Sequence, residues 1–138
     1  MQGWNGNEQE RTFQFVDVST GAVRTIRGRE ADAPVEWSPD GRRILFSECQ
    51  PPRHETAVLA LLDIETGSTS IVAKATGKDN CPHYESFAWS PDGRRIGYIR
   101  CTPVLVKPEA CDVHVMNADG TQSRRLTTTP GLERSLDW

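Results

Sequence analysis

The feature that most constrains this chain is a ten-residue stretch that occurs twice. Residues 37–46 read Trp-Ser-Pro-Asp-Gly-Arg-Arg-Ile-Leu-Phe, and residues 89–98 repeat eight of these ten positions. The last three residues, Leu-Asp-Trp at 136–138, match the residues that lead into each copy. The tryptophans of these three segments, Trp37, Trp89 and Trp138, lie 52 and 49 residues apart. A near-constant period of this length indicates a repeat protein in which each repeat is one supersecondary unit.

The repeated stretch has the composition of a β-hairpin. Residues 38–41 read Ser-Pro-Asp-Gly; proline fixes φ at the second position of a type I turn, and the glycine accepts a positive φ. Apolar and polar residues alternate on both sides. Val35 and Trp37 share one face of the incoming strand, and Ile44 and Phe46 share one face of the outgoing strand. This pattern predicts two antiparallel strands, and the turn alone accounts for both Asp-Gly pairs without catalysis.

A second type of hairpin recurs three times around these stretches. Each copy has two apolar, alternating runs joined by a turn that contains glycine. If the strands of one repeat are named a to d, with a and b flanking the Ser-Pro-Asp-Gly turn, the chain runs c-d, a-b-c-d, a-b-c-d and a final a. No segment shows helical periodicity, so the sequence predicts an all-β protein. The three predicted c-d hairpins pair residues 11–18 with 22–26, 59–64 with 68–72, and 113–116 with 122–126.

The Trp-Ser-Pro-Asp-Gly turn between two strands resembles the TolB-like repeat, a WD40-like module of β-propellers. The resemblance covers essentially the whole chain. It implies blades of four antiparallel strands arranged around a channel. It does not imply one function, because such blades occur in periplasmic TolB proteins, in propeller domains of prolyl-oligopeptidase-type serine peptidases, and in sensor or scaffold proteins.

The number of repeats predicts a partial β-propeller, with about two complete blades and a third that is split between the two ends of the chain. We divide the single domain of residues 1–138 into blade pieces 11–30, 31–76, 77–129 and 130–138. A closed propeller needs at least about four blades, and an unpaired strand promotes association. The chain is therefore expected to be a piece of a larger propeller, with missing blades in a parent chain, or a subunit that approaches a ring as a homodimer.

Composition and charge exclude several classes of partner. The formal net charge is −3 and the pI is near 5.6, so no overall basic field favours nucleic acid. No apolar run approaches the ~18 residues that a membrane-spanning helix needs. Residues 1–8 lack the basic and apolar regions of a signal peptide. The protein is therefore expected either to be cytosolic or to take its signal from an upstream portion of a longer chain.

The four cysteines lie in the segments that differ between repeats. Cys49 and Cys101 each follow their repeat's tryptophan by twelve residues and end a predicted strand b. Cys111 opens the next strand, so it and Cys101 flank one hairpin loop within disulfide reach, about 5.5 Å between Cα atoms. Cys81 then leaves Cys49 as its partner. Of three possible connectivities, we predict Cys49–Cys81 with Cys101–Cys111, which favours a periplasmic or other extracytoplasmic location.

Zinc binding and unpaired thiols are the alternatives for these cysteines. Cys49 and His54 share one loop, and Cys81 and His83 share the next. Two cysteines and two histidines on one face would suit a tetrahedral zinc ion. However, the spacings Cys-x4-His and Cys-x-His match no common zinc module. The sequence therefore predicts neither a metal site nor a cofactor.

The sequence carries no recognisable catalytic motif. It contains no Gly-x-Ser-x-Gly nucleophile elbow, no His-Glu-x-x-His and no phosphate-binding glycine run. His114 is expected within a strand as a partly buried sheet residue. The basic pairs Arg42-Arg43 and Arg94-Arg95 are expected on solvated strand edges.

These observations favour a non-catalytic scaffold over an enzyme. The b-to-c and d-to-a loops lie on one face of an up-and-down blade, and loops that vary on a repeated frame are where binding usually resides. We expect that a protein or peptide partner contacts this face through Arg53, His54, His83 and Tyr84. The alternative is the substrate-gating propeller of a prolyl-oligopeptidase-type serine peptidase whose catalytic domain is absent from this chain.

Overall fold

A computed structural model describes residues 12–27, 35–50, 55–77, 82–102, 110–128 and 136–138. The described residues form β-strands and no helix, which confirms the all-β prediction, and none of these segments is a helix that could cross a membrane. The chain divides into two compact units, Met1–Glu30 and Ala31–Trp138. The strands are β1 (Thr12–Val16), β2 (Val23–Arg27), β3 (Glu36–Trp37), β4 (Arg43–Gln50), β5 (Thr56–Asp63), β6 (Thr69–Thr76), β7 (His83–Trp89), β8 (Arg95–Thr102), β9 (Ala110–Asn117) and β10 (Arg124–Arg125).

The first unit contains one hairpin, at the position predicted for the first c-d pair. β1 pairs antiparallel with β2 along its whole length. Phe13 and Phe15 lie on the same face, as the alternation predicts, with their ring centroids 6.3 Å apart. The carboxylate of Asp17 closes the turn by accepting hydrogen bonds from the backbone N–H groups of Ser19 and Thr20. The hairpin therefore follows directly from local sequence pattern and turn chemistry.

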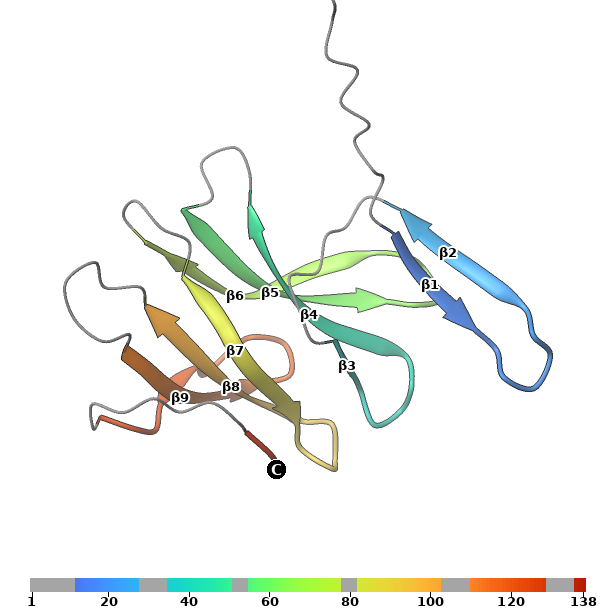
Figure 1. Cartoon of the computed structure of the whole chain (residues 1–138). Helices are drawn as coiled ribbons and strands as arrows, with labels where there is room; N and C mark the ends of the chain where they lie inside the picture. The colour runs from blue at the N-terminus through green and yellow to red at the C-terminus, as the bar shows by residue number, and fades with distance from the viewer. Residues whose placement is uncertain (1–11, 28–34, 51–54, 78–81, 103–109, 129–135) are drawn as a thin grey trace, which may run out of the picture. The chain divides into compact units, whose positions relative to one another are not determined.

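The second unit contains two four-stranded antiparallel sheets of the same topology (Figure 1). The first blade has the strand order β3-β4-β5-β6, and the second blade has the order β7-β8-β9-β10. Each blade is thus the predicted a-b-c-d meander, and this confirms the fold class of a partial propeller built from four-stranded blades. The observed c strands are longer than the apolar runs that predicted them, because backbone pairing continues to Thr56 in β5 and to Ala110 in β9.

The Ser-Pro-Asp-Gly segments form the same tight turn in both blades. The backbone N–H of Gly41 donates a hydrogen bond to the carbonyl oxygen of Ser38 at 2.8 Å, and Gly93 makes the equivalent bond at 2.8 Å. The two glycines have φ angles of 70° and 69°, in the left-handed region that favours glycine. As predicted, these turns set the pairing of β3 with β4 and of β7 with β8.

The hydrophobic core of the second unit lies between its two blades. Strand β7 contacts β3, β4 and β5 of the first blade. One cluster of buried side chains includes Leu59 and Val72 from the first blade and Phe87, Trp89 and Tyr98 from the second. Burial stabilises such a cluster by roughly 25 cal/mol per Å² of apolar surface. The two blades therefore form one packed unit and are not two independent sheets.

Two contacts beside this core also join the blades. The guanidinium carbon of Arg43 lies 5.2 Å from the ring centroid of Trp89, which is a cation–π contact. Gly120 lies so close to Val72 that a Cβ atom at this position would stand 2.7 Å from the Val72 carbonyl oxygen. The expectation that Arg43 lies on a solvated strand edge is wrong, because a ring from the next blade packs against its guanidinium group.

The last residues of the chain pack on the second blade. The backbone N–H of Leu136 donates a hydrogen bond to the hydroxyl of Ser86 at 3.2 Å. A Cβ atom on Gly97 would stand 2.8 Å from Cδ2 of Leu136, so the leucine fills the space above this glycine. Successive residues of a strand point to opposite faces, and Tyr98 belongs to the core between the blades. Leu136 therefore covers the other face of the second blade, as expected for the start of a third repeat.

Candidate functional site

The strand order gives the second unit two chemically different ends. The a-b and c-d turns lie together at one end, which we call the turn end. The b-c and d-a connections lie at the opposite end, which we call the loop end. Residues 51–54, 78–81 and 103–109 of these connections are outside the described residues, so the loop end is described by the strand termini that lead into them.

At the turn end, the aspartates stabilise their own turns by accepting hydrogen bonds. In each blade the turn serine donates its hydroxyl proton at 2.6 Å, to Asp40 in the first blade and to Asp92 in the second. These hydrogen bonds hold the pKa of both carboxyls below the usual value. Hydrogen bonds from Thr66 and Thr121 lower the pKa of Asp63 and Asp119 in the same way. Carboxylates held ionised and engaged within their own turns are poorly suited to general acid–base chemistry.

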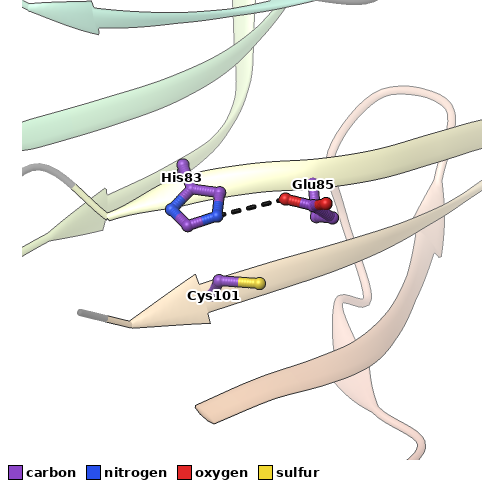
Figure 2. Close-up of side chains that lie close together, drawn as sticks. All are labelled: His83, Glu85 and Cys101. Carbon is purple, nitrogen blue, oxygen red and sulfur yellow. Dashed lines mark ion pairs between the residues drawn. The ribbon is translucent and has the colours of Figure 1, made fainter. Parts of the chain in front are cut away.

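At the loop end, three side chains of the second blade lie close together (Figure 2). Nε2 of His83 lies 3.2 Å from a carboxylate oxygen of Glu85, and Sγ of Cys101 is within 4.8 Å of ligand atoms of both. His83 and Cys101 face each other directly across β7 and β8. The pairing of these strands shifts by one residue between Tyr84 and Ser86. This β-bulge makes Glu85 the extra residue, and such bulges redirect side chains.

The cysteine of this cluster is oxidised. Cys101 forms a disulfide with Cys111, its direct neighbour on β9, as predicted. A disulfide sulfur lacks the thiolate charge that makes cysteine a metal ligand. Cys49 is also disulfide-bonded, and its predicted partner Cys81 is outside the described residues. The oxidised cluster is therefore a His–Glu pair beside a disulfide and does not provide a thiolate for a metal ion.

The structure places the residues predicted to contact a partner in different environments. Arg53 and His54 are outside the described residues. His83 begins β7, and 43% of its side chain is exposed. Tyr84 is in β7 and not in a loop, and its side chain is buried, so its ring is not presented at the surface of the loop end. Sequence reasoning missed Glu85, whose only signal was its i, i+2 spacing from His83.

A buried aromatic stack lies on the inner face of the second blade. The ring of Tyr98 stacks on His114 with centroids 5.1 Å apart and meets Tyr84 edge-on at 5.7 Å. The Tyr98 hydroxyl is 2.7 Å from the hydroxyl of Ser123, and burial raises the pKa of Tyr84. Nε2 of His114 is buried and has no hydrogen-bond partner among the described residues. Burial, followed by the nearby positive charge of Arg100, lowers the pKa of His114.

The lowered pKa of His114 predicts a loss of stability in mild acid. The unfolded chain takes up a proton near the ordinary histidine value of 6.5, whereas the folded chain resists that proton until a lower pH. Above pH 6.5, His114 is neutral in both the folded and the unfolded chain, and the free energy of unfolding keeps its full value. As the pH falls below 6.5, proton uptake by the unfolded chain lowers the free energy of unfolding. Urea unfolding at about pH 7.5 and about pH 5 measures the loss.

The variant His114→Phe keeps an aromatic ring against Tyr98 and removes the proton-binding group. We expect the free energy of unfolding of this variant to fall less between the two pH values than that of the unaltered chain. Parallel pH profiles for the unaltered chain and His114→Phe would show that His114 does not contribute.

Comparison with known proteins places this geometry among propeller proteins. No protein-family model matches the chain. The Tol-Pal system protein TolB of Anaeromyxobacter dehalogenans (strain 2CP-C) is 29% identical over 102 residues, which are 74% of this chain and 20% of that protein. The crystal structure of TolB from Acinetobacter baumannii matches with a TM-score of 0.58 and 20% identity, over 88% of this chain and 28% of that chain.

A second solved structure gives the same fold. The β-propeller domain of the Trilobed protease from Pyrococcus furiosus matches with a TM-score of 0.59 and 19% identity, over 86% of this chain and 35% of that chain. The present chain spans about a fifth of the length of the curated TolB relatives. Sequence repeat, blade topology and these likenesses agree, and the repeats of this chain are TolB-like β-propeller repeats.

Proposed function

We propose that this chain forms part of a non-catalytic β-propeller scaffold that binds a protein or peptide partner at its loop end. The observation that carries the proposal is the chemical contrast between the two ends of the blades. At the turn end, aspartate and hydroxyl groups are engaged in hydrogen bonds inside their own turns. At the loop end, the half-exposed pair of His83 and Glu85 adjoins connections whose sequences differ between the repeats. Binding sites are commonly found in such variable connections on a rigid frame.

The disulfides support a location outside the reducing cytosol. Cys101 is bonded to Cys111, and Cys49 is disulfide-bonded as well. Disulfides persist in the periplasm and other oxidising compartments and are rare in the cytosol. The named TolB relatives are Tol-Pal system proteins, and a role for this chain in an assembly of that kind is part of the proposal. The ring itself would be completed by blades of a parent chain or by a second copy.

A propeller domain that gates substrate for a peptidase is the second candidate. It is favoured by the likeness to the propeller domain of the Trilobed protease, which at 19% identity concerns the fold. The flanking coding sequence discriminates between the two candidates. A hydrolase domain with a Gly-x-Ser-x-Gly motif in the same reading frame would support the peptidase, and a propeller without such a domain would support the scaffold.

Photo-cross-linking tests where a partner binds. A photoreactive side chain is placed at position 83 of the loop end in one variant and at the exposed position 65 of the turn end in another. Both proteins are illuminated in an extract of the compartment to which the native protein is exported. We expect one adduct of defined mass from position 83, and we expect the additional substitution Glu85→Gln to weaken it. No such adduct is expected from position 65. Equal labelling from both ends would contradict a loop-end site.

A further inference from the structure

The disulfide and the His–Glu pair at the loop end lie on one face of three neighbouring strands. His83 on β7 is directly opposite Cys101 on β8, and Cys101 is directly opposite Cys111 on β9. Directly paired residues of antiparallel strands project from the same face of a sheet. The bulge at Glu85 keeps that carboxylate on the same face, with one oxygen 3.2 Å from His83. The ligand atoms of His83, Glu85 and Cys101 thus lie within 4.8 Å of one another, and the disulfide places Cys111 beside Cys101. In this oxidised state neither sulfur is a thiolate that could bind a metal ion.

The same four side chains have the chemistry of a zinc site once the sulfurs are reduced. Zn²⁺ is held by cysteine thiolates, histidine nitrogen and carboxylate oxygen, almost always four in a tetrahedron. Thiolates in the set select this class of soft, divalent ion over magnesium or calcium. A cross-strand pair of cysteines flanked by histidine and glutamate supplies two sulfurs, one nitrogen and one oxygen.

We propose that the reduced protein binds one Zn²⁺-class ion through Cys101, Cys111, His83 and Glu85, and that formation of the Cys101–Cys111 disulfide closes this site. A dithiol reductant transfers two electrons and two protons to the disulfide, which yields two cysteine thiols and the oxidised dithiol. Zn²⁺ then replaces the two thiol protons, which are released to solvent. The reverse direction requires a disulfide oxidant, which expels the ion as the sulfur–sulfur bond forms.

Burial determines how the ion would reach this site. Cys101 and Cys111 are almost completely buried, with 0% and 3% of their surface exposed. The side chains of His83 and Glu85 are 43% and 38% exposed, so they form the solvent side of the cluster. The ion would therefore bind His83 and Glu85 first, and the two buried thiolates would then complete its coordination.

Cobalt spectroscopy tests the proposal on the full chain. Co²⁺ replaces Zn²⁺ in tetrahedral sites and gives thiolate-to-metal charge-transfer and ligand-field absorption. The protein is reduced with a phosphine, freed of air and titrated with Co²⁺, and then with Zn²⁺ in competition. We expect one tetrahedral Co²⁺ per chain with two thiolate ligands, displaced by Zn²⁺, and no such spectrum from the oxidised protein.

Matched variants locate the ion. His83→Ala and Glu85→Gln change half-exposed side chains and are expected to weaken Co²⁺ binding by at least about tenfold, and Cys111→Ser is expected to abolish the two-thiolate spectrum. Cys49→Ser is the control and is expected to keep it. Unchanged binding by His83→Ala and Glu85→Gln, loss of binding in Cys49→Ser, or no tetrahedral Co²⁺ in the reduced protein would each overturn the proposal.

Discussion

Replacing Gly120 by alanine is expected to destabilise the protein by about 2–5 kcal/mol. Gly120 has a φ of 86°, and an L-residue in this left-handed region costs about 1–2 kcal/mol. The added Cβ would also stand 2.7 Å from the carbonyl oxygen and 3.0 Å from Cα of Val72 in the other blade. These are backbone atoms that cannot move aside without shifting β6, and overpacking of this kind costs about 1–3 kcal/mol more.

Gly67 provides a matched control for this prediction. It closes the equivalent turn of the first blade with a φ of 73°, and a Cβ there would meet no atom within 4 Å. Gly67→Ala is therefore expected to show only the backbone cost, about 1–2 kcal/mol. Urea unfolding of both variants measures the difference. If the two variants lose the same free energy of unfolding, the c-d turn of the second blade does not press against the first blade.

Truncation of Leu59 to alanine is expected to have an effect of similar size. Leu59 is on the central strand β5, has 0% of its surface exposed and belongs to the cluster shared by both blades. Removal of a buried leucine side chain loses its transfer free energy and leaves a cavity, at a cost of about 2–5 kcal/mol. The loss is measured as a lower urea midpoint at an unchanged slope.

Ile71 is the control for this truncation, because it is in the outer strand β6 of the same blade and is 54% exposed. Ile71→Ala is expected to cost less than about 1 kcal/mol. A large effect at Ile71 together with a small effect at Leu59 would mean that the first blade buries the face that carries Ile71 and not the face that carries Leu59.

The features that sequence predicted well are those that neighbouring residues determine. The Ser-Pro-Asp-Gly turns follow from proline and glycine at fixed positions, and the hairpins follow from alternation on either side of a turn. The disulfide between Cys101 and Cys111 could be predicted for the same reason, because both residues flank one predicted loop. The repeated tryptophan motif then supplied the order of the strands and the resemblance to propeller blades.

The features that sequence missed depend on contacts between segments that lie far apart in the chain. Arg43 packs on Trp89, 46 residues away, and a local alternation pattern cannot show which ring covers a basic residue. The sequence predicts Tyr84 on the loop face, whereas backbone pairing with Arg100 places it within β7 and its ring packs edge-on against Tyr98. The bulge that brings Glu85 toward His83 is a property of strand pairing, and no residue type in β7 predicts it.

The packing of the two repeats as neighbouring propeller blades is tested most directly by a through-space proton contact between Gly120 and Val72. A Cβ at Gly120 would stand 3.0 Å from Cα of Val72, so the Gly120 α-protons must lie near the α-proton of Val72. A nuclear Overhauser spectrum of the full chain is expected to show this cross-peak beside the cross-strand peaks within each blade. Its absence, with the cross-strand peaks of both blades present, would contradict the packed pair of blades.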